Sequence, residues 1–231
     1  MVYLSLRKFE ALIMIKKIAT FEEYKIEYER SINNPEKFWE EKAQNFTWRR
    51  KWDNILSWDF KKPEIKWFEG GKLNITENCL DRHLGRKQTQ TAIKWIANNP
   101  KEKNITLSYR ELYTEVCKFA NVLKRRGVKK GDRVCLYMPM IPELAISVLA
   151  CARIGAIHSV VFAGFSAKSL ADRINDATCK LLITADGGFR GAKITPLKKI
   201  ADEAMRNTPS IEKCIVFKRT KSNIQMKKNR D

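Results

Sequence analysis

The sequence is poor in residues that hold metal ions. It has two histidines, neither at the spacing of a metal site, and its six cysteines form no CxxC pair. Most of the cysteines lie inside apolar, periodic segments, which is typical of buried, reduced thiols in a cytosolic protein. We therefore expect no metal site. The cysteines are Cys79, Cys117, Cys135, Cys151, Cys179 and Cys214.

Long hydrophobic runs are also absent near the N-terminus. Its first segment, MVYLSLRKFEALIMIKK, contains the short apolar run ALIMI and no small-residue cleavage site. This predicts neither a secretory signal nor a membrane span, so we expect a cytoplasmic protein without a membrane partner. Regular patterning begins only after Met14; residues 1–20 are predicted to be an extension, with Met14 a candidate start.

The common motifs of catalysis and nucleotide binding are missing. The sequence contains no GxSxG, GxxxxGK[ST], HExxH or GxGxxG. His158 lies within an apolar strand and is predicted to be a core histidine, while His83 has no evident nucleophile or carboxylate partner. No catalytic residue is therefore assigned in this chain.

Acidic residues are outnumbered, with 26 Asp and Glu against 45 Lys and Arg and a net charge of +19. Such an excess is compatible with a basic nucleic-acid-binding protein, which would present a clustered cationic face. The positive charges are instead spread along the whole chain, with one local concentration at 218–231. This distribution favours an ordinary solvated surface and argues against a nucleic-acid partner.

The segment 21–62 is dense in charge and tryptophan. FEEYKIEYERSINNPEKFWEEKA has helix-like spacing, so we predict a helical, aromatic-anchored N-terminal region. Its tryptophans are expected to be packing anchors rather than a ligand cage. They are Trp39, Trp48, Trp52 and Trp58.

The pattern changes after Thr106. Ser108 and Glu111 form a capping box before an amphipathic helix, and Gly127 stands where that helix should end. Short apolar strands then alternate with helices, which predicts parallel βαβ units in a doubly wound α/β fold. The expected strands are 133–138, 157–162, 180–185 and 214–217; the expected helices begin at Pro142, after Ser166 and near Pro196.

Two glycine-bearing loops follow predicted strands, AGFSA (163–167) and DGGFRGAK (186–193). Both should lie at the carboxyl edge of the sheet, where ligands bind in such folds. Glycines allow backbone amides to approach an anion, Arg190 can bind two phosphate oxygens, and Lys193 adds a second charge. These residues favour a phosphate monoester, although an ordinary solvated loop would have the same composition.

Three stretches closely resemble the N-terminal portion of the AMP-forming acetyl-CoA synthetase (acetate–CoA ligase) family of adenylate-forming enzymes. They are WFEGGKLNITENCLDRHL (67–84), the run from ITLSYREL to DRINDA (105–177) and ITADGGFRGAKITPLKKIADEA (183–204). The resemblance implies a helical N-terminal cap region over 21–80. It then implies an incomplete doubly wound parallel-sheet subdomain over 81–231, the first part of the AMP-binding domain.

The resemblance also implies the chemistry. The family joins acetate to ATP to give acetyl-AMP and pyrophosphate, with Mg²⁺ expected to accompany ATP, and CoA then displaces AMP. Arg190, Gly191, Ala192 and Lys193 match the family's segment for the phosphorylated adenosine end of CoA. Gly164 matches a glycine along the route of the pantetheine arm.

The family's phosphate loop, acetate pocket, ribose-binding aspartate and catalytic lysine all lie beyond the equivalent of Asp231. The chain is therefore expected to hold part of a CoA site and to be inactive alone, with an unpaired strand edge and uncovered apolar faces. An inert or interaction-only fragment that pairs with a separately encoded C-terminal remainder is the alternative reading.

Overall fold

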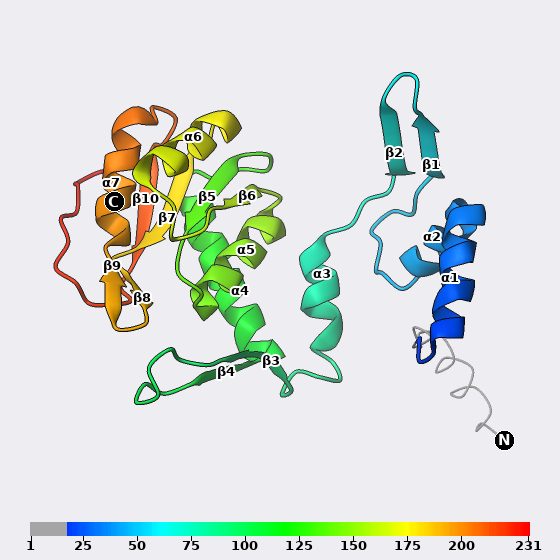
Figure 1. Cartoon of the computed structure of the whole chain (residues 1–231), viewed down its shortest axis with the longest axis horizontal. Helices are drawn as coiled ribbons and strands as arrows, with labels where there is room; N and C mark the ends of the chain where they lie inside the picture. The colour runs from blue at the N-terminus through cyan, green and yellow to red at the C-terminus, as the bar shows by residue number, and fades with distance from the viewer. Residues whose placement is uncertain (1–17) are drawn as a thin grey trace. The chain divides into compact units, whose positions relative to one another are not determined.

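The computed structural model describes residues 18–231, which divide into two compact units, one ending at Asn74 and the other spanning Ile75–Asp231 (Figure 1). Each unit has its own secondary structure and is described by itself. The predicted extension 1–20, with the candidate start at Met14, lies almost wholly outside the described residues.

The N-terminal unit contains two helices and a hairpin. The helical prediction is confirmed over 21–43, where Thr20 and Glu23 form a capping box and Pro35 begins the second helix. It is wrong beyond that, because the segment from 54 to 69 forms an antiparallel hairpin. Its strands, NILSWD and EIKWFE, carry the β-branched and aromatic residues that favour strands. The elements are α1 (Phe21–Asn33), α2 (Pro35–Ala43), β1 (Asn54–Asp59) and β2 (Glu64–Glu69).

The tryptophans of this unit have different environments. Trp48 and Trp52 pack against each other with ring centroids 5.0 Å apart, and both contact Phe68. These two are packing anchors, as predicted. Trp58 is not, because it is 62% exposed.

The C-terminal unit is built on a parallel sheet of strand order β10-β7-β5-β6. Registers such as Val216↔Thr184, Cys135↔Leu182 and Cys135↔Ser159 confirm that all its strands run in the same direction. The doubly wound α/β prediction is confirmed. The strands are β5 (Arg133–Tyr137), β6 (Ile157–Val160), β7 (Leu181–Ala185) and β10 (Lys213–Phe217).

Helices cover both faces of this sheet, because alternate strand residues point to opposite sides. Val134, Leu136 and Ile183 join one core cluster with residues of α4 and α5. Cys135 and Leu182 join a second cluster with residues of α6 and α7. The helices are α4 (Tyr109–Arg125), α5 (Pro142–Ile154), α6 (Ala167–Ala177) and α7 (Leu197–Ala204), the last continued by the short η2 (Met205–Asn207).

The predicted helix signals occupy their expected places. The side chains of Ser108 and Glu111 cap α4 reciprocally, and Ser166 caps α6. Gly155 ends α5 with a φ of 75° and Gly127 follows α4 with a φ of 84°, both in the left-handed region that glycine tolerates. The remaining elements of the unit are α3 (Ile75–Cys79), η1 (Asp81–His83) and the antiparallel pair β3 (Thr91–Trp95) and β4 (Ile105–Ser108).

The edges of the sheet explain one wrong prediction. His158 lies on β6, an edge strand, and is exposed rather than part of the core. The opposite edge is β10, as expected, but it is not wholly unpaired as predicted, because its Cys214 N–H donates to the Arg230 carbonyl at 2.8 Å. A groove of about 460 Å³, lined mainly by apolar side chains such as Ile105, Phe119 and Ile215, lies on the same unit.

None of the helices within 18–231 has the length and apolar character needed to cross a membrane.

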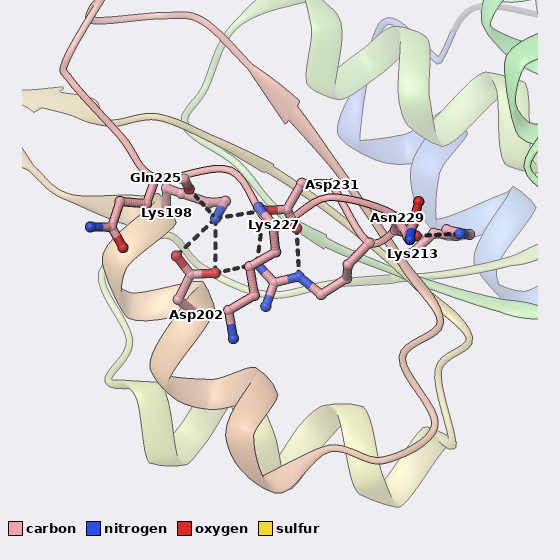
Figure 2. A network of polar contacts seen from close by, with 8 residues as sticks. Lys198, Asp202, Lys213, Gln225, Lys227, Asn229 and Asp231 are labelled. Atoms are coloured by element: carbon pink, nitrogen blue, oxygen red, sulfur yellow. Dashed lines mark hydrogen bonds and ion pairs between the residues drawn. The ribbon is translucent and has the colours of Figure 1, made fainter.

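The segment after β10 is held against α7 by a charged network (Figure 2). Lys198 of α7 is 1% exposed and its Nζ lies 2.8 Å from Asp202 and 3.0 Å from Asp231. The same Nζ donates to the Gln225 carbonyl at 3.0 Å, and Arg230 pairs with both carboxylates. Every charge in this network therefore has a partner, which buried charges require.

Candidate functional site

A cavity of about 670 Å³ opens at the carboxyl ends of the parallel strands, a volume typical of small-molecule sites. Segments that follow β5, β6 and β7 line it, together with Trp95 at the end of β3 and Arg219 after β10. Residues of both predicted loops line it. Of the predicted site residues, Gly164 and Arg190 are in the lining, whereas Gly191, Ala192 and Lys193 are not. The lining includes Trp95, Asn98, Met138–Ile141, Leu144, Val160–Gly164, Gly188–Arg190, Thr195, Leu197 and Arg219.

The second predicted loop is a β-hairpin rather than an open glycine loop. Its strands are β8 (Gly188–Arg190) and β9 (Lys193–Thr195), paired antiparallel. The turn residues are Gly191, with a φ of 58°, and Ala192, whose φ is not positive. A glycine at the first central position is the pattern of a type II′ turn, which suits a tight hairpin. The sequence alone suggested a loop because the strands are only three residues long.

The hairpin brings the two predicted cations together. Arg190 and Lys193 are paired directly across the strands, so their side chains project from the same face with Cβ atoms about 5 Å apart. Both residues are exposed, and within 18–231 neither forms an ion pair. Like charges directly opposite each other are unfavourable. A bound anion would offset that repulsion, which makes this face of the hairpin suited to a phosphate group.

Gly164 lines the same cavity as Arg190, although it comes from the loop after β6. A Cβ placed on Gly164 would lie 2.4 Å from Cε1 of Phe162, far inside contact distance. The Phe162 ring is 64% exposed and packs edge-on to Phe165 at 5.7 Å. Glycine therefore keeps this wall of the cavity open beside an aromatic side chain.

Sequence reasoning missed Arg219. Its guanidinium lies 5.3 Å from the centroid of the Trp95 ring and 4.9 Å from that of Phe189, and it donates to Glu102 at 2.7 Å. In the sequence it was one of many basic residues near the C-terminus, with no pattern to distinguish it. Asn98 was also missed, because it stands in no motif; its Nδ2 donates to the Gly191 carbonyl at 3.1 Å.

Asp186, at the base of the hairpin, was missed although it lies in the predicted loop. Its carboxylate is buried and accepts backbone hydrogen bonds from Gly187, Arg219 and Thr220 through one oxygen and from Ser222 through the other. Burial opposes its ionisation, but these four N–H donors outweigh that effect and lower the pKa of Asp186. The carboxylate is a structural anchor for the loops that flank the cavity.

Cys151, Cys214 and His83 have shifted pKa values. Burial raises the pKa of Cys151 and of Cys214 to about 12, which keeps both thiols protonated and inert. Burial and the nearby Arg82 and Lys87 lower the pKa of His83, whose ring lies 4.9 Å from that of Tyr109. In the part of the chain that the structure describes, no group of three His, Cys, Asp or Glu residues could hold a metal ion.

Comparisons with known proteins match most of the described residues, from 24 to 230. A family model described as "AMP-binding enzyme" matches residues 80–230, and one described as "Acetyl-coenzyme A synthetase N-terminus" matches residues 24–79. The chain is 52% identical over 209 residues to an acetyl-coenzyme A synthetase of Bdellovibrio bacteriovorus, covering 90% of this chain and 32% of that protein. It is 54% identical over 211 residues to the Saccharophagus degradans protein of the same name, covering 91% and 33%.

A solved structure shares the fold. The acetoacetyl-CoA synthetase from Streptomyces lividans superimposes with a TM-score of 0.79 at 24% sequence identity, covering 90% of this chain and 31% of that one. The chain thus spans about a third of the length of the relatives that it matches. The matched N-terminus model places that third at the beginning of those relatives.

Proposed function

The chain belongs to the AMP-binding enzyme family, and from that membership we propose that it forms the N-terminal part of an AMP-forming acetate–CoA ligase and carries part of its CoA site. The complete enzyme would join acetate to ATP, giving acetyl-AMP and pyrophosphate, and CoA thiolate would then displace AMP. Residues 21–80 would be its N-terminal region and 81–231 the first part of its AMP-binding domain. A cytoplasmic location belongs to the same proposal and is supported by four buried, free thiols.

One observation carries the CoA assignment. Gly164 and Arg190, which lie on separate loops, line one cavity at the carboxyl edge of the sheet, and Lys193 is paired directly opposite Arg190. The guanidinium can bind two oxygens of the 3′-phosphate of CoA, and the ammonium adds a second charge. Gly191 and Ala192 make the turn that keeps the two cations side by side, and the open wall at Gly164 leaves room for the thin pantetheine arm.

Adenylation is proposed for the complete protein. No residue of this chain is assigned to the catalysis of acetyl-AMP formation or to the binding of ATP and its Mg²⁺. A separately encoded remainder is therefore a proposed partner. Co-expression with a candidate C-terminal piece should restore acetate- and ATP-dependent pyrophosphate release, whereas the 231-residue chain alone should show none above a mock preparation.

The CoA assignment is tested by calorimetric titration of the chain with CoA and with dephospho-CoA, which lacks the 3′-phosphate. Because a hydrogen bond to a charged group contributes about 1.5–3 kcal/mol, Arg190→Ala should weaken CoA binding about 10- to 100-fold. The same variant should change dephospho-CoA binding little, and Lys193→Ala should have a smaller effect of the same kind.

The matched control is Lys118→Ala, which removes an exposed cation of α4 that pairs with Glu115. It should bind CoA as the unaltered chain does. Equal binding of CoA by Arg190→Ala and the unaltered chain would refute the assignment. Equal losses in Arg190→Ala and Lys118→Ala would instead indicate a general effect of net charge, as expected of a basic nucleic-acid-binding protein.

A further inference from the structure

Arg219 connects the segments that surround the cavity. Its guanidinium contacts the Phe189 ring on β8, the Trp95 ring at the end of β3, and Glu102 in the segment between β3 and β4. The last two lie more than a hundred positions away in the sequence. Its charge is already shared between a carboxylate and two aromatic faces, and its side chain is 15% exposed. Arg190 and Lys193, by contrast, are exposed and paired directly across the hairpin.

The backbone of Arg219 is held equally firmly. Its N–H donates to Asp186 Oδ1 at 2.7 Å, and the N–H groups of Thr220 and Ser222 donate to the same carboxylate. Asp186 is two residues before β8. One buried carboxylate therefore fixes both the base of the hairpin and the loop that carries Arg219.

The hairpin itself has little to stabilise it. Its two strands have three residues each, and an isolated two-stranded hairpin is marginally stable at best in water. Contacts from outside must help to hold it. Arg219 supplies one through Phe189, and Asn98 supplies another through the Gly191 carbonyl. Trp95 Nε1, which donates to the Met140 carbonyl at 2.8 Å, anchors the segment from which both Asn98 and Glu102 extend.

We propose that Arg219 is a positioning residue for the phosphate-binding hairpin: by stacking between Phe189 and Trp95 and pairing with Glu102, it fixes the neighbouring Arg190 over the cavity. The expected effect of Arg219 on CoA binding rests on the proposed function. Its expected effect on the order of the hairpin does not. In this proposal Arg190 binds the phosphate, and Arg219 sets the position of Arg190 without binding the phosphate itself.

Whether Arg219 holds the hairpin is tested without any ligand, by amide hydrogen exchange of the 231-residue chain. Arg219→Ala should speed exchange at residues 189–194 about tenfold while leaving β7 unchanged. Arg219→Lys should be intermediate, because it keeps the charge near Glu102 but loses the planar stacking surface. The matched control Lys218→Ala removes the exposed cation next to it and should exchange as the unaltered chain does.

Unchanged exchange in the hairpin of Arg219→Ala would overturn the proposal. So would an equal acceleration in β7, since that would indicate general destabilisation of the unit rather than release of the hairpin.

The functional consequence is tested with CoA and dephospho-CoA. Arg219→Ala should weaken CoA binding about tenfold and dephospho-CoA binding little, and it should add nothing to the loss already caused by Arg190→Ala. Equal losses for both ligands, or additive losses in the double variant, would show that Arg219 does not act through Arg190. If the unaltered chain fails to bind CoA, the proposed function fails, and the exchange measurement still decides the role of Arg219.

Discussion

Asp186 is 1% exposed and carries a negative charge that four backbone N–H groups stabilise. Such a group couples folding to pH. Its pKa is lower in the folded chain than the ordinary aspartate value of about 3.9, so its ionised form contributes stability above that pH. The contribution is lost as the pH falls through the folded pKa. Asp231 behaves in the same way, because hydrogen bonds from Arg230 and Lys198 overcome burial and lower its pKa to about 2.

We therefore expect the free energy of unfolding of the C-terminal unit to decline as the pH is lowered from about 4 to about 2. Urea titrations at a series of pH values measure this decline. Asp186→Asn keeps the shape of the side chain but removes the charge, so the variant should be less stable at pH 7 by about 3 kcal/mol. Its stability should also depend less steeply on pH in that window; an identical pH dependence would contradict the role given to Asp186.

The turn of the β8–β9 hairpin aligns the two cations of the candidate site. Gly191 has a φ of 58°, which an L-residue with a Cβ adopts only at a cost of about 1–2 kcal/mol. A Cβ there would meet nothing within 4 Å, so the cost would come from the backbone alone. The turn, and with it the alignment of Arg190 and Lys193, depends on this conformation.

Gly191→Ala should therefore loosen the hairpin, raising amide exchange at 189–194 and weakening CoA binding several-fold, with little change in the rest of the unit. Gly85→Ala is the matched control, since Gly85 also has open space around its Cα but no positive φ. That substitution should be neutral or slightly stabilising, because it reduces the freedom of the unfolded chain. Equal effects of the two substitutions would argue against a strained turn.

The contact between α7 and the segment after β10 depends on Lys198 (Figure 2). Lys198→Met would leave the carboxylates of Asp202 and Asp231 with Arg230 as their one charged partner in the network. Removing one member of a buried ion network typically costs about 3–5 kcal/mol, and we expect a loss of that size in urea unfolding. Lys199→Met, the exposed neighbour on the same helix, should change stability by less than about 0.5 kcal/mol. Similar losses in the two variants would show that the network contributes little.

The two units of the chain differ in how much apolar surface they bury. Within 18–74 the one buried hydrophobic residue is Ala43, and helix α1 has none. The C-terminal unit has two core clusters, one on each face of its sheet. Because the burial of apolar surface supplies most of the favourable free energy of folding, we expect the N-terminal unit to be much less stable than the C-terminal unit.

Limited proteolysis tests this difference, since Lys and Arg occur throughout both units. Trypsin should cleave within 18–74 first and leave a resistant fragment close to 75–231, and thermal unfolding should show two transitions. A single transition with simultaneous cleavage of both units would contradict the expectation. Acetate- and ATP-dependent pyrophosphate release remains the measurement that decides the activity proposed for the complete protein.

Local signals in the sequence were enough for most elements of the C-terminal unit. Ser108 with Glu111, Pro142, Gly155 and Ser166 mark helix ends because capping and left-handed φ depend on residues a few positions apart. The alternation of short apolar strands with helices likewise predicted the parallel sheet, since both faces of such a sheet must be buried. The grouping of Arg190 and Gly164 at one edge followed from that topology.

Tertiary structure alone decided what local patterns do not contain. His158 is exposed because β6 is an edge strand, and strand order is set by pairing between distant segments. The conformation of 186–195 as a hairpin, and the contacts of Arg219 with Trp95 and Glu102, likewise join residues far apart in the chain. Composition and periodicity report what a residue prefers next to its neighbours in sequence, whereas these features depend on which segments the folded sheet brings together.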